Sequence, residues 1–359
     1  MDRRAAPAGD VFVHSVALMG TVVTMEVIAG ARNERIADAR QAVTRAFDWF
    51  RQVEESCSRF DPASEVMRLS ARIGTPVPVS ALLFHATEVA LAVAADSGGA
   101  FDPTVGGRMA ARGFDTNYRT GAIAPARDVC GSVSFRDVVL DRRLRTITLR
   151  QPLILDLGAV AKGLAIDLAA RELSGFANHA IDAGGDLFLA GRNRGDRPWR
   201  VGIRHPRDRE RLIASVRVAN RAVCTSGDYE RPAPAGGHHI LDPRSGEPVD
   251  AVASVTVIAP TAVLADALGT AAFVLGASDG IALLDRHGVD GLVVTASLEQ
   301  HATRGMYRDH ELCPRAGGGR SGDAAILRDT EGPPDRRSDD PGGARRVVGR
   351  TRTRRARPA

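Results

Sequence analysis

Several residue types and patterns that would narrow the function are scarce in this chain of 359 residues. Aromatic residues make up only 4% of the sequence, so the 44% of hydrophobic residues must build a mainly aliphatic core. No apolar run is predicted to be long enough to span a bilayer. The cysteines lack the spacing of a zinc site and indicate a reducing compartment or buried thiols. There are four of them, at Cys57, Cys130, Cys224 and Cys313.

The first residues also lack the features of an export signal. Residues 1–10 form a short polar N-terminus with basic residues but no apolar segment, and no early cysteine can carry a lipid. We therefore expect a cytoplasmic protein without an integral membrane segment. A misplaced start codon would hide an export signal, and this alternative stays open.

The positive charge of the chain is concentrated at its C-terminus. The net charge is +5, and residues 316–359 hold 11 arginines against 6 acidic residues, so the rest of the chain is balanced. Residues 313–359 are rich in glycine, proline and arginine, which cannot bury a core, and we predict a disordered tail. A basic tail can contact nucleic acid or an acidic surface, but a solvated appendage is the favoured interpretation, and we predict no nucleic-acid partner.

Residues 11–312 are predicted to form one α+β domain with mixed sheets. Apolar patterns of period two, or short continuous apolar runs, predict strands, and amphipathic patterns predict helices. The main predicted strands are residues 11–18, 22–28, 138–141, 144–149, 152–155, 180–191, 199–204, 213–218, 222–229, 238–241, 252–258 and 291–295. The main predicted helices are residues 34–55, 80–95, 164–173, 262–275 and 278–287.

A glycine-containing turn connects the predicted strand at 152–155 to the helix at 164–173. Asp156 lies at the strand end, and Lys162 is predicted to open the helix. A helix start offers free N–H groups and a partial positive charge, which suit a phosphate, and an ammonium adds a full charge. Lys162 is the only lysine in the chain. We interpret it as a phosphate-binding group; a solvated lysine that survived by chance is the alternative.

A second glycine-rich loop spans residues 98–107. Its Asp102 can accept a hydrogen bond from a ribose or a ring N–H, although an ordinary surface turn fits the loop as well. The β-α-β pattern lacks the G-x-G-x-x-G fingerprint at its first turn, which disfavours a nicotinamide dinucleotide site.

Two oxygen-bearing side chains lie four residues apart on the predicted helix at 262–275. Asp266 and Thr270 therefore share one helix face, and a carboxylate with a hydroxyl is a donor set that Mg²⁺ prefers. The alternative is structural: Thr270 bonds back to the carbonyl of Asp266, and Asp266 is merely exposed.

His238 and His239 point to opposite faces of a predicted short strand, so only one of them can face a given site. His239 is the candidate base, because a neutral imidazole can take a proton from a hydroxyl near physiological pH. A hydrogen-bonded structural histidine is the alternative.

Eight segments in this order resemble the FAD:protein FMN transferase family, the ApbE-type flavin transferases. Each is weak alone, but together they extend over residues 19–295. The segments are Met19-Gly20-Thr21, Gly99 to Val105, Asp156 to Gly163, Asp182-Ala183-Gly184-Gly185-Asp186, Trp199 to Ile203, Thr225-Ser226-Gly227-Asp228-Tyr229, His238 to Pro243 and Asp266-Ala267-Leu268-Gly269-Thr270.

The resemblance implies a Mg²⁺-dependent enzyme that moves FMN from FAD to a threonine or serine of a target flavoprotein and releases AMP. It also implies a two-lobed, T-fold-like architecture with FAD in a cleft between the lobes. The acceptor is expected to be a redox-pump subunit or a reductase. Two alternatives remain, a FAD pyrophosphatase that yields FMN and AMP, and a flavin-binding carrier without turnover.

The resemblance also assigns roles to single residues. Asp266, Thr270 and the Ala159 carbonyl match the Mg²⁺ ligands, and His239 and Lys162 match catalytic positions. The family often has tyrosine where this chain has Phe60, so a hydroxyl contact would be missing there. The positions matching FAD contacts are Met19, Phe60, Ala100, Phe101, Asp102, Asp156, Lys162 and Ile240.

Overall fold

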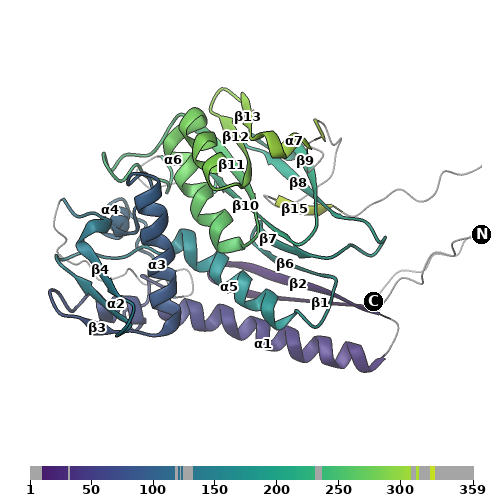
Figure 1. Ribbon diagram of the computed structural model, residues 1–359, viewed down its shortest axis with the longest axis horizontal. Coiled ribbons are helices and arrows are strands. Elements are labelled where there is room, and N and C mark those ends of the chain that lie inside the picture. The colour runs from purple at the N-terminus through teal and green to yellow at the C-terminus, as the bar shows by residue number, and fades with distance from the viewer. Residues whose placement is uncertain are drawn as a thin grey trace, which may run out of the picture. The chain divides into compact units, whose positions relative to one another are not determined.

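The computed structural model describes residues 10–30, 33–117, 120–121, 123, 132–230, 237–308, 313–314 and 324–327 (Figure 1). All of them belong to a unit that extends from Met1 to Arg328. The predicted N-terminal segment lies outside these residues except for Asp10, and so does most of the predicted tail.

An eight-stranded antiparallel sheet forms the centre of the fold. Its order is β1-β2-β6-β7-β10-β11-β12-β13, so most neighbours in the sheet are consecutive strands, and only the pairs β2-β6 and β7-β10 join strands that are far apart in the sequence. The strands are β1 (Asp10–Leu18), β2 (Thr21–Gly30), β6 (His179–Ala183), β7 (Asp186–Ala190), β10 (Arg221–Gly227), β11 (Val252–Ala259), β12 (Asp290–Thr295) and β13 (Gln300–Ala302).

The two faces of this sheet are buried in two different apolar cores. Successive residues alternate between them: Ile181 belongs to the larger core and Ala180 to the smaller one, as do Val257 and Ile258. The long helices of the larger core are α1 (Asn33–Cys57), α3 (Ala81–Asp96), α5 (Gly158–Glu172) and α6 (Ala262–Arg286). The smaller core packs against β8 (Trp199–His205) and β9 (Asp208–Val218).

The remaining elements are short. A group of them gathers on the left in Figure 1: α2 (Glu65–Leu69), α4 (Gly106–Ala111), β3 (Val77–Pro78), β4 (Val138–Asp141) and β5 (Thr146–Leu149). Two 3₁₀ turns, η1 (Pro103–Val105) and η2 (Phe135–Asp137), lie between them in sequence, and α7 (Arg304–Arg308) follows β13.

The α+β class is confirmed, and most predicted elements lie within a few residues of their predicted bounds. Ser80 caps α3 as expected, since its hydroxyl accepts a hydrogen bond from the Leu83 N–H (3.1 Å). Pairs of named strands are all antiparallel in the described part of the chain, and a parallel bridge joins Ile73 to Leu149. The pairing is therefore less mixed than predicted.

The predicted strand at 152–155 is wrong. Leu153, Ile154 and Leu155 are buried and Pro152 is exposed, and none of them belongs to a strand, because an apolar run indicates burial and does not specify hydrogen-bonded neighbours. A Cβ added at Gly106 would lie 2.5 Å from the Ile154 carbonyl oxygen, so the segment packs closely against α4. The strand predicted at 238–241 is also reduced, to an isolated bridge between Leu241 and Pro248.

Two short segments of the predicted tail pair with a sheet. β14 (Cys313–Pro314) pairs with β9, and β15 (Ala324–Leu327) pairs with β8, which completes a four-stranded sheet. For the other residues of 313–359, disorder stays a prediction.

Helix α6 combines the two helices predicted at 262–275 and 278–287. Gly276 interrupts it with a left-handed φ of 83°, which accounts for the break in the sequence pattern. By length and apolar composition α6 could cross a membrane, contrary to the sequence-based expectation. Its residues, however, form part of the larger core, including Phe273 and Leu283, so it is a core helix of this fold.

Candidate functional site

Lys162 pairs with a buried carboxylate and does not open its helix. Helix α5 begins at Gly158, so Lys162 lies in its second turn, a correction to the sequence-based prediction. Its Nζ forms an ion pair with Oδ2 of Asp186, whose side chain is only 4% exposed, while that of Lys162 is 24% exposed. A carboxylate so deeply buried requires a cationic partner, and the single lysine of the chain provides it.

Helices α5 and α6 pack closely against each other at the start of α6. The Asp167 carboxylate accepts hydrogen bonds from the N–H groups of Ala262 (2.7 Å) and Val263 (3.0 Å), the first residues of α6. A Cβ at Gly163 would lie 2.5 Å from the Ala262 carbonyl oxygen, so only glycine fits this crossing.

Replacing Gly163 by alanine is expected to lower the free energy of unfolding by about 1–3 kcal/mol, because the added methyl group would push α6 away from α5. Urea denaturation measures this. The matched control is Gly175→Ala, where no atom lies within 4 Å of the added Cβ. Equal effects of the two substitutions would contradict the close crossing.

Asp266 and Thr270 lie on α6 facing β10, beside a third oxygen donor. The Asp266 residue is 7% exposed, so the alternative in which it is merely exposed is wrong. The other half of that alternative holds, since the Thr270 hydroxyl donates to the Asp266 carbonyl (3.3 Å). Oγ of Ser226 lies 3.5 Å from Oγ1 of Thr270. A buried carboxylate with two nearby hydroxyls is a set of hard oxygen donors that fits Mg²⁺.

The thiol of Cys224 shows that these charges lie close together. Burial first, and then the carboxylates of Asp186 and Asp266, raise the pKa of the Cys224 thiol well above its usual value, whereas Lys162 lowers it. Asp186 on β7, Asp266 on α6 and Lys162 on α5 therefore all lie within electrostatic range of Cys224 on β10.

Asp156 lies directly before α5 and pairs with an arginine from a distant loop. Its Oδ1 accepts a hydrogen bond from the Gly158 N–H (2.8 Å), and its Oδ2 accepts one from Nε of Arg59 (2.6 Å). Arg59 is 5% exposed, and its guanidinium lies 4.2 Å from the ring centroid of Phe60. The structure thus links two of the predicted FAD-contacting positions, Phe60 and Asp156, through Arg59.

The other predicted FAD-contacting positions occupy turns around this region. Met19 lies in the β1–β2 turn with a left-handed φ of 50°, and Thr21, the first residue of β2, packs on Gly184 between β6 and β7. Ala100, Phe101 and Ile240 are buried in the larger core.

The Asp102 carboxylate accepts hydrogen bonds within its own neighbourhood. Its donors are the Thr104 N–H (2.9 Å), the Thr104 hydroxyl (2.7 Å) and the Phe135 N–H (2.9 Å). Asp102 therefore caps η1, and the Pro103 carbonyl beside it accepts from the Asp156 N–H (2.7 Å). Its predicted contact with FAD stays a prediction.

The two neighbouring histidines have different environments. His238 is buried: Nδ1 accepts from the Ile240 N–H (3.2 Å), so Nε2 carries the proton and donates to the Val249 carbonyl (3.0 Å). Its ring also packs edge-to-face on Phe273, one turn beyond Thr270. His239 is half-buried, with its ring 6.5 Å from that of Phe114. His238 is thus the structural histidine, and His239 remains the candidate base.

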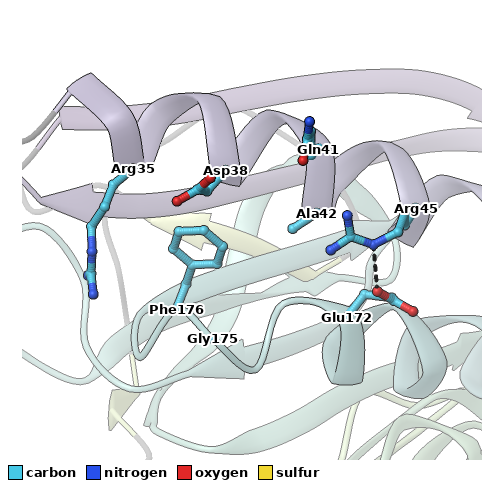
Figure 2. Close-up of a pocket in the computed structure, with 8 residues that line it drawn as sticks. All are labelled: Arg35, Asp38, Gln41, Ala42, Arg45, Glu172, Gly175 and Phe176. Carbon is cyan, nitrogen blue, oxygen red and sulfur yellow. Dashed lines mark hydrogen bonds and ion pairs between the residues drawn. The ribbon is translucent and has the colours of Figure 1, made fainter.

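A hollow of about 350 Å³ lies elsewhere, between α1 and the end of α5. Figure 2 shows Phe176 beneath α1 and the ion pair of Arg45 with Glu172 at one edge. No residue of the predicted site lines this hollow, so it is not the flavin site that the resemblance implies.

Three residues that contact the predicted site residues were not identified from the sequence. They are Asp186, Ser226 and Arg59. Asp186 is part of the Asp182–Asp186 motif, and an acidic residue at an inward strand position is a signal that could have identified it. Ser226 is likewise part of a quoted motif. Arg59 is separated from Asp156 by 97 positions, and no local pattern indicates their pairing.

Comparisons with known proteins identify relatives of this chain. The chain is 35% identical over 299 residues to an FAD:protein FMN transferase from Treponema pallidum (strain Nichols), covering 75% of this chain and 81% of the relative. It is 33% identical over 293 residues to one from Rhodobacter capsulatus, covering 79% of this chain but only 55% of that longer relative.

The fold is likewise similar to that of a solved structure. The ApbE protein from Thermotoga maritima superimposes with a TM-score of 0.73 at 29% identity, covering 83% of this chain and 99% of the other. A family model described as the ApbE family matches residues 19–293. The chain therefore belongs to the ApbE family, a family of transferase enzymes.

Proposed function

We propose that this chain transfers the FMN half of FAD to a threonine or serine hydroxyl of an acceptor flavoprotein in a Mg²⁺-dependent reaction that releases AMP. The names of the two relatives support the reaction type. The observation that carries the proposal for this chain is the arrangement of charge around β10, where Lys162 and Asp186 lie near the buried Asp266.

The residues between α5 and α6 would hold the metal ion. Asp266 and Thr270 would supply side-chain oxygens, and the Ala159 carbonyl in the first turn of α5 would supply a third; the close packing of α5 against the start of α6 supports this. When bound, Mg²⁺ would neutralise charge on the FAD diphosphate. Ser226 lies beside Thr270 and is an additional oxygen donor that the sequence did not identify.

His239 acts as the base in this proposal. The imidazole takes the proton of the acceptor hydroxyl, and that oxygen attacks the phosphorus on the riboflavin side of the diphosphate. A new P–O bond forms as the P–O bond to AMP breaks. Lys162 stabilises the charge that develops on the diphosphate, because positioning and electrostatics dominate phosphoryl transfer.

Measuring AMP release with and without an acceptor flavoprotein tests the proposal. We expect AMP only when FAD, Mg²⁺ and the acceptor are all present, and none after addition of EDTA. AMP release without an acceptor would show a pyrophosphatase. Tight FAD binding without any AMP would show a carrier.

Replacing His239 by alanine is expected to lower turnover by about 10²–10⁴-fold, the usual contribution of a general base, while FAD affinity is retained. Stopped assays of AMP release and flavin fluorescence titration measure the two quantities. The matched control is the neighbouring His238→Ala, which removes the bond to Val249 and the contact with Phe273, so it should lower stability. A large loss of FAD affinity in His239→Ala would show a structural role instead.

A further inference from the structure

We infer that Arg108, Arg112 and Phe114, on α4 and directly after it, hold His239 in its working position. They are positioning residues, since each contacts the loop that carries His239 or the His239 ring itself. The inference rests on the proposed function of His239 as the base.

His239 lies in a narrow loop whose two arms are joined by hydrogen bonds. Near its tip the Asp242 N–H donates to the Glu247 carbonyl (2.9 Å), and the Gly246 N–H donates to the Asp242 carbonyl (2.7 Å). Further down, Leu241 pairs with Pro248. The loop therefore moves as a unit, and what holds its tip also limits the movement of His239.

Two arginines from α4 hold this tip. Nη1 of Arg108 donates to the Pro243 carbonyl (2.6 Å). Arg112, one turn later, donates through Nη2 to the Glu247 carboxylate (2.8 Å) and through Nη1 to the Gly246 carbonyl (3.3 Å). Residues four apart share a helix face, so both guanidinium groups reach the same turn.

Phe114 contacts the imidazole itself. The rings of Phe114 and His239 meet edge-to-face at 6.5 Å, with an interplanar angle of 66°. The backbone fixes Phe114, because Gly113 takes a left-handed φ of 85° and the Phe114 N–H donates to the Met109 carbonyl (3.1 Å). The same short helix thus constrains both the tip of the loop and the ring of His239.

The opposite side of the loop is anchored on α6. His238 packs on Phe273 there, and its Nε2 bonds to Val249. The loop is consequently held from two sides, by α4 and by α6. Because a misplacement of about 1 Å can lower the rate about 100-fold, loosening the α4 side would slow proton transfer while leaving FAD binding in place.

The test uses the full chain with Arg108→Ala, and Arg143→Ala as a control at an exposed arginine of the β4–β5 turn. We expect kcat for FMN transfer to fall by up to about 100-fold, KM for FAD to stay unchanged, and amide hydrogen exchange in residues 237–249 to become faster. Arg108→Lys should recover activity, since one donor suffices for the Pro243 carbonyl. In a His239→Ala background, Arg108→Ala should cause no further loss of turnover.

Two results would overturn the inference. One is unchanged hydrogen exchange in residues 237–249 of Arg108→Ala. The other is an undiminished effect of Arg108→Ala when His239 is already alanine, since Arg108 would then act elsewhere. Hydrogen exchange is measured without FAD, so it tests the positioning of the loop even if the chain is not a transferase. A failure of the proposed function would instead appear as no FMN transfer by the unaltered chain.

Discussion

Replacing Asp266 by asparagine is expected to lower kcat/KM for FMN transfer by about 10³-fold, because an amide cannot supply the negative charge that a divalent cation requires. A bound metal ion contributes several kcal/mol of transition-state stabilisation, and about 1.4 kcal/mol corresponds to a tenfold change in rate. Asparagine has nearly the same shape as aspartate, so the packing of α6 on β10 should be retained. AMP release as a function of Mg²⁺ concentration measures the effect.

A second readout separates loss of the metal from loss of the fold. A ligand that binds only the folded state raises the melting temperature, so Mg²⁺ with FAD should stabilise the unaltered chain but not Asp266→Asn. Asp279→Asn is the matched control, because Asp279 is exposed on the same helix. Transfer by Asp266→Asn at the rate of the control would contradict the assignment.

Replacing Lys162 by methionine is expected to abolish transfer and also to destabilise the fold. It removes the cation beside the buried Asp186 and leaves a carboxylate uncompensated. Breaking a buried pair in this way costs about 3–5 kcal/mol, and we expect the lower end because 24% of the Lys162 side chain is exposed. Urea denaturation and AMP release measure the two effects.

The double variant Lys162→Met/Asp186→Asn separates the two roles of the lysine. Removing both charges should recover most of the lost stability, since no buried charge remains without a partner. Activity should stay absent, because the charge on the diphosphate would still lack its cation. Recovery of activity together with stability would show that Lys162 serves only to neutralise Asp186.

The elements of the fold were predictable where a pattern is local. The strand pair at 10–30, the long helix α1 and the cap at Ser80 all follow from short-range periodicity and turn chemistry. The segment at 152–155 was not, because its apolar residues only indicate that it is buried. The start of α5 was missed because Gly158 and Gly163 suggest a turn, whereas Gly163 is required by the close approach of α6.

For the site, single residues were easier to predict than their partners. Lys162 stands out by composition, and Asp266 with Thr270 by helical spacing. Their surroundings depend on contacts between distant segments: Asp186 from β7, Ser226 from β10 and Arg59 from the loop before α2. The sequence favoured His239 over His238 as the base, and the hydrogen bonds of His238 show that His238 is a structural histidine.

The central claim is that this chain attaches FMN covalently to another protein. The most direct measurement is mass spectrometry of a candidate acceptor flavoprotein after incubation with the chain, FAD and Mg²⁺. We predict one added FMN, bound through its phosphate to a threonine or serine, and one AMP released for each adduct. An unmodified acceptor, with or without AMP release, would contradict the account.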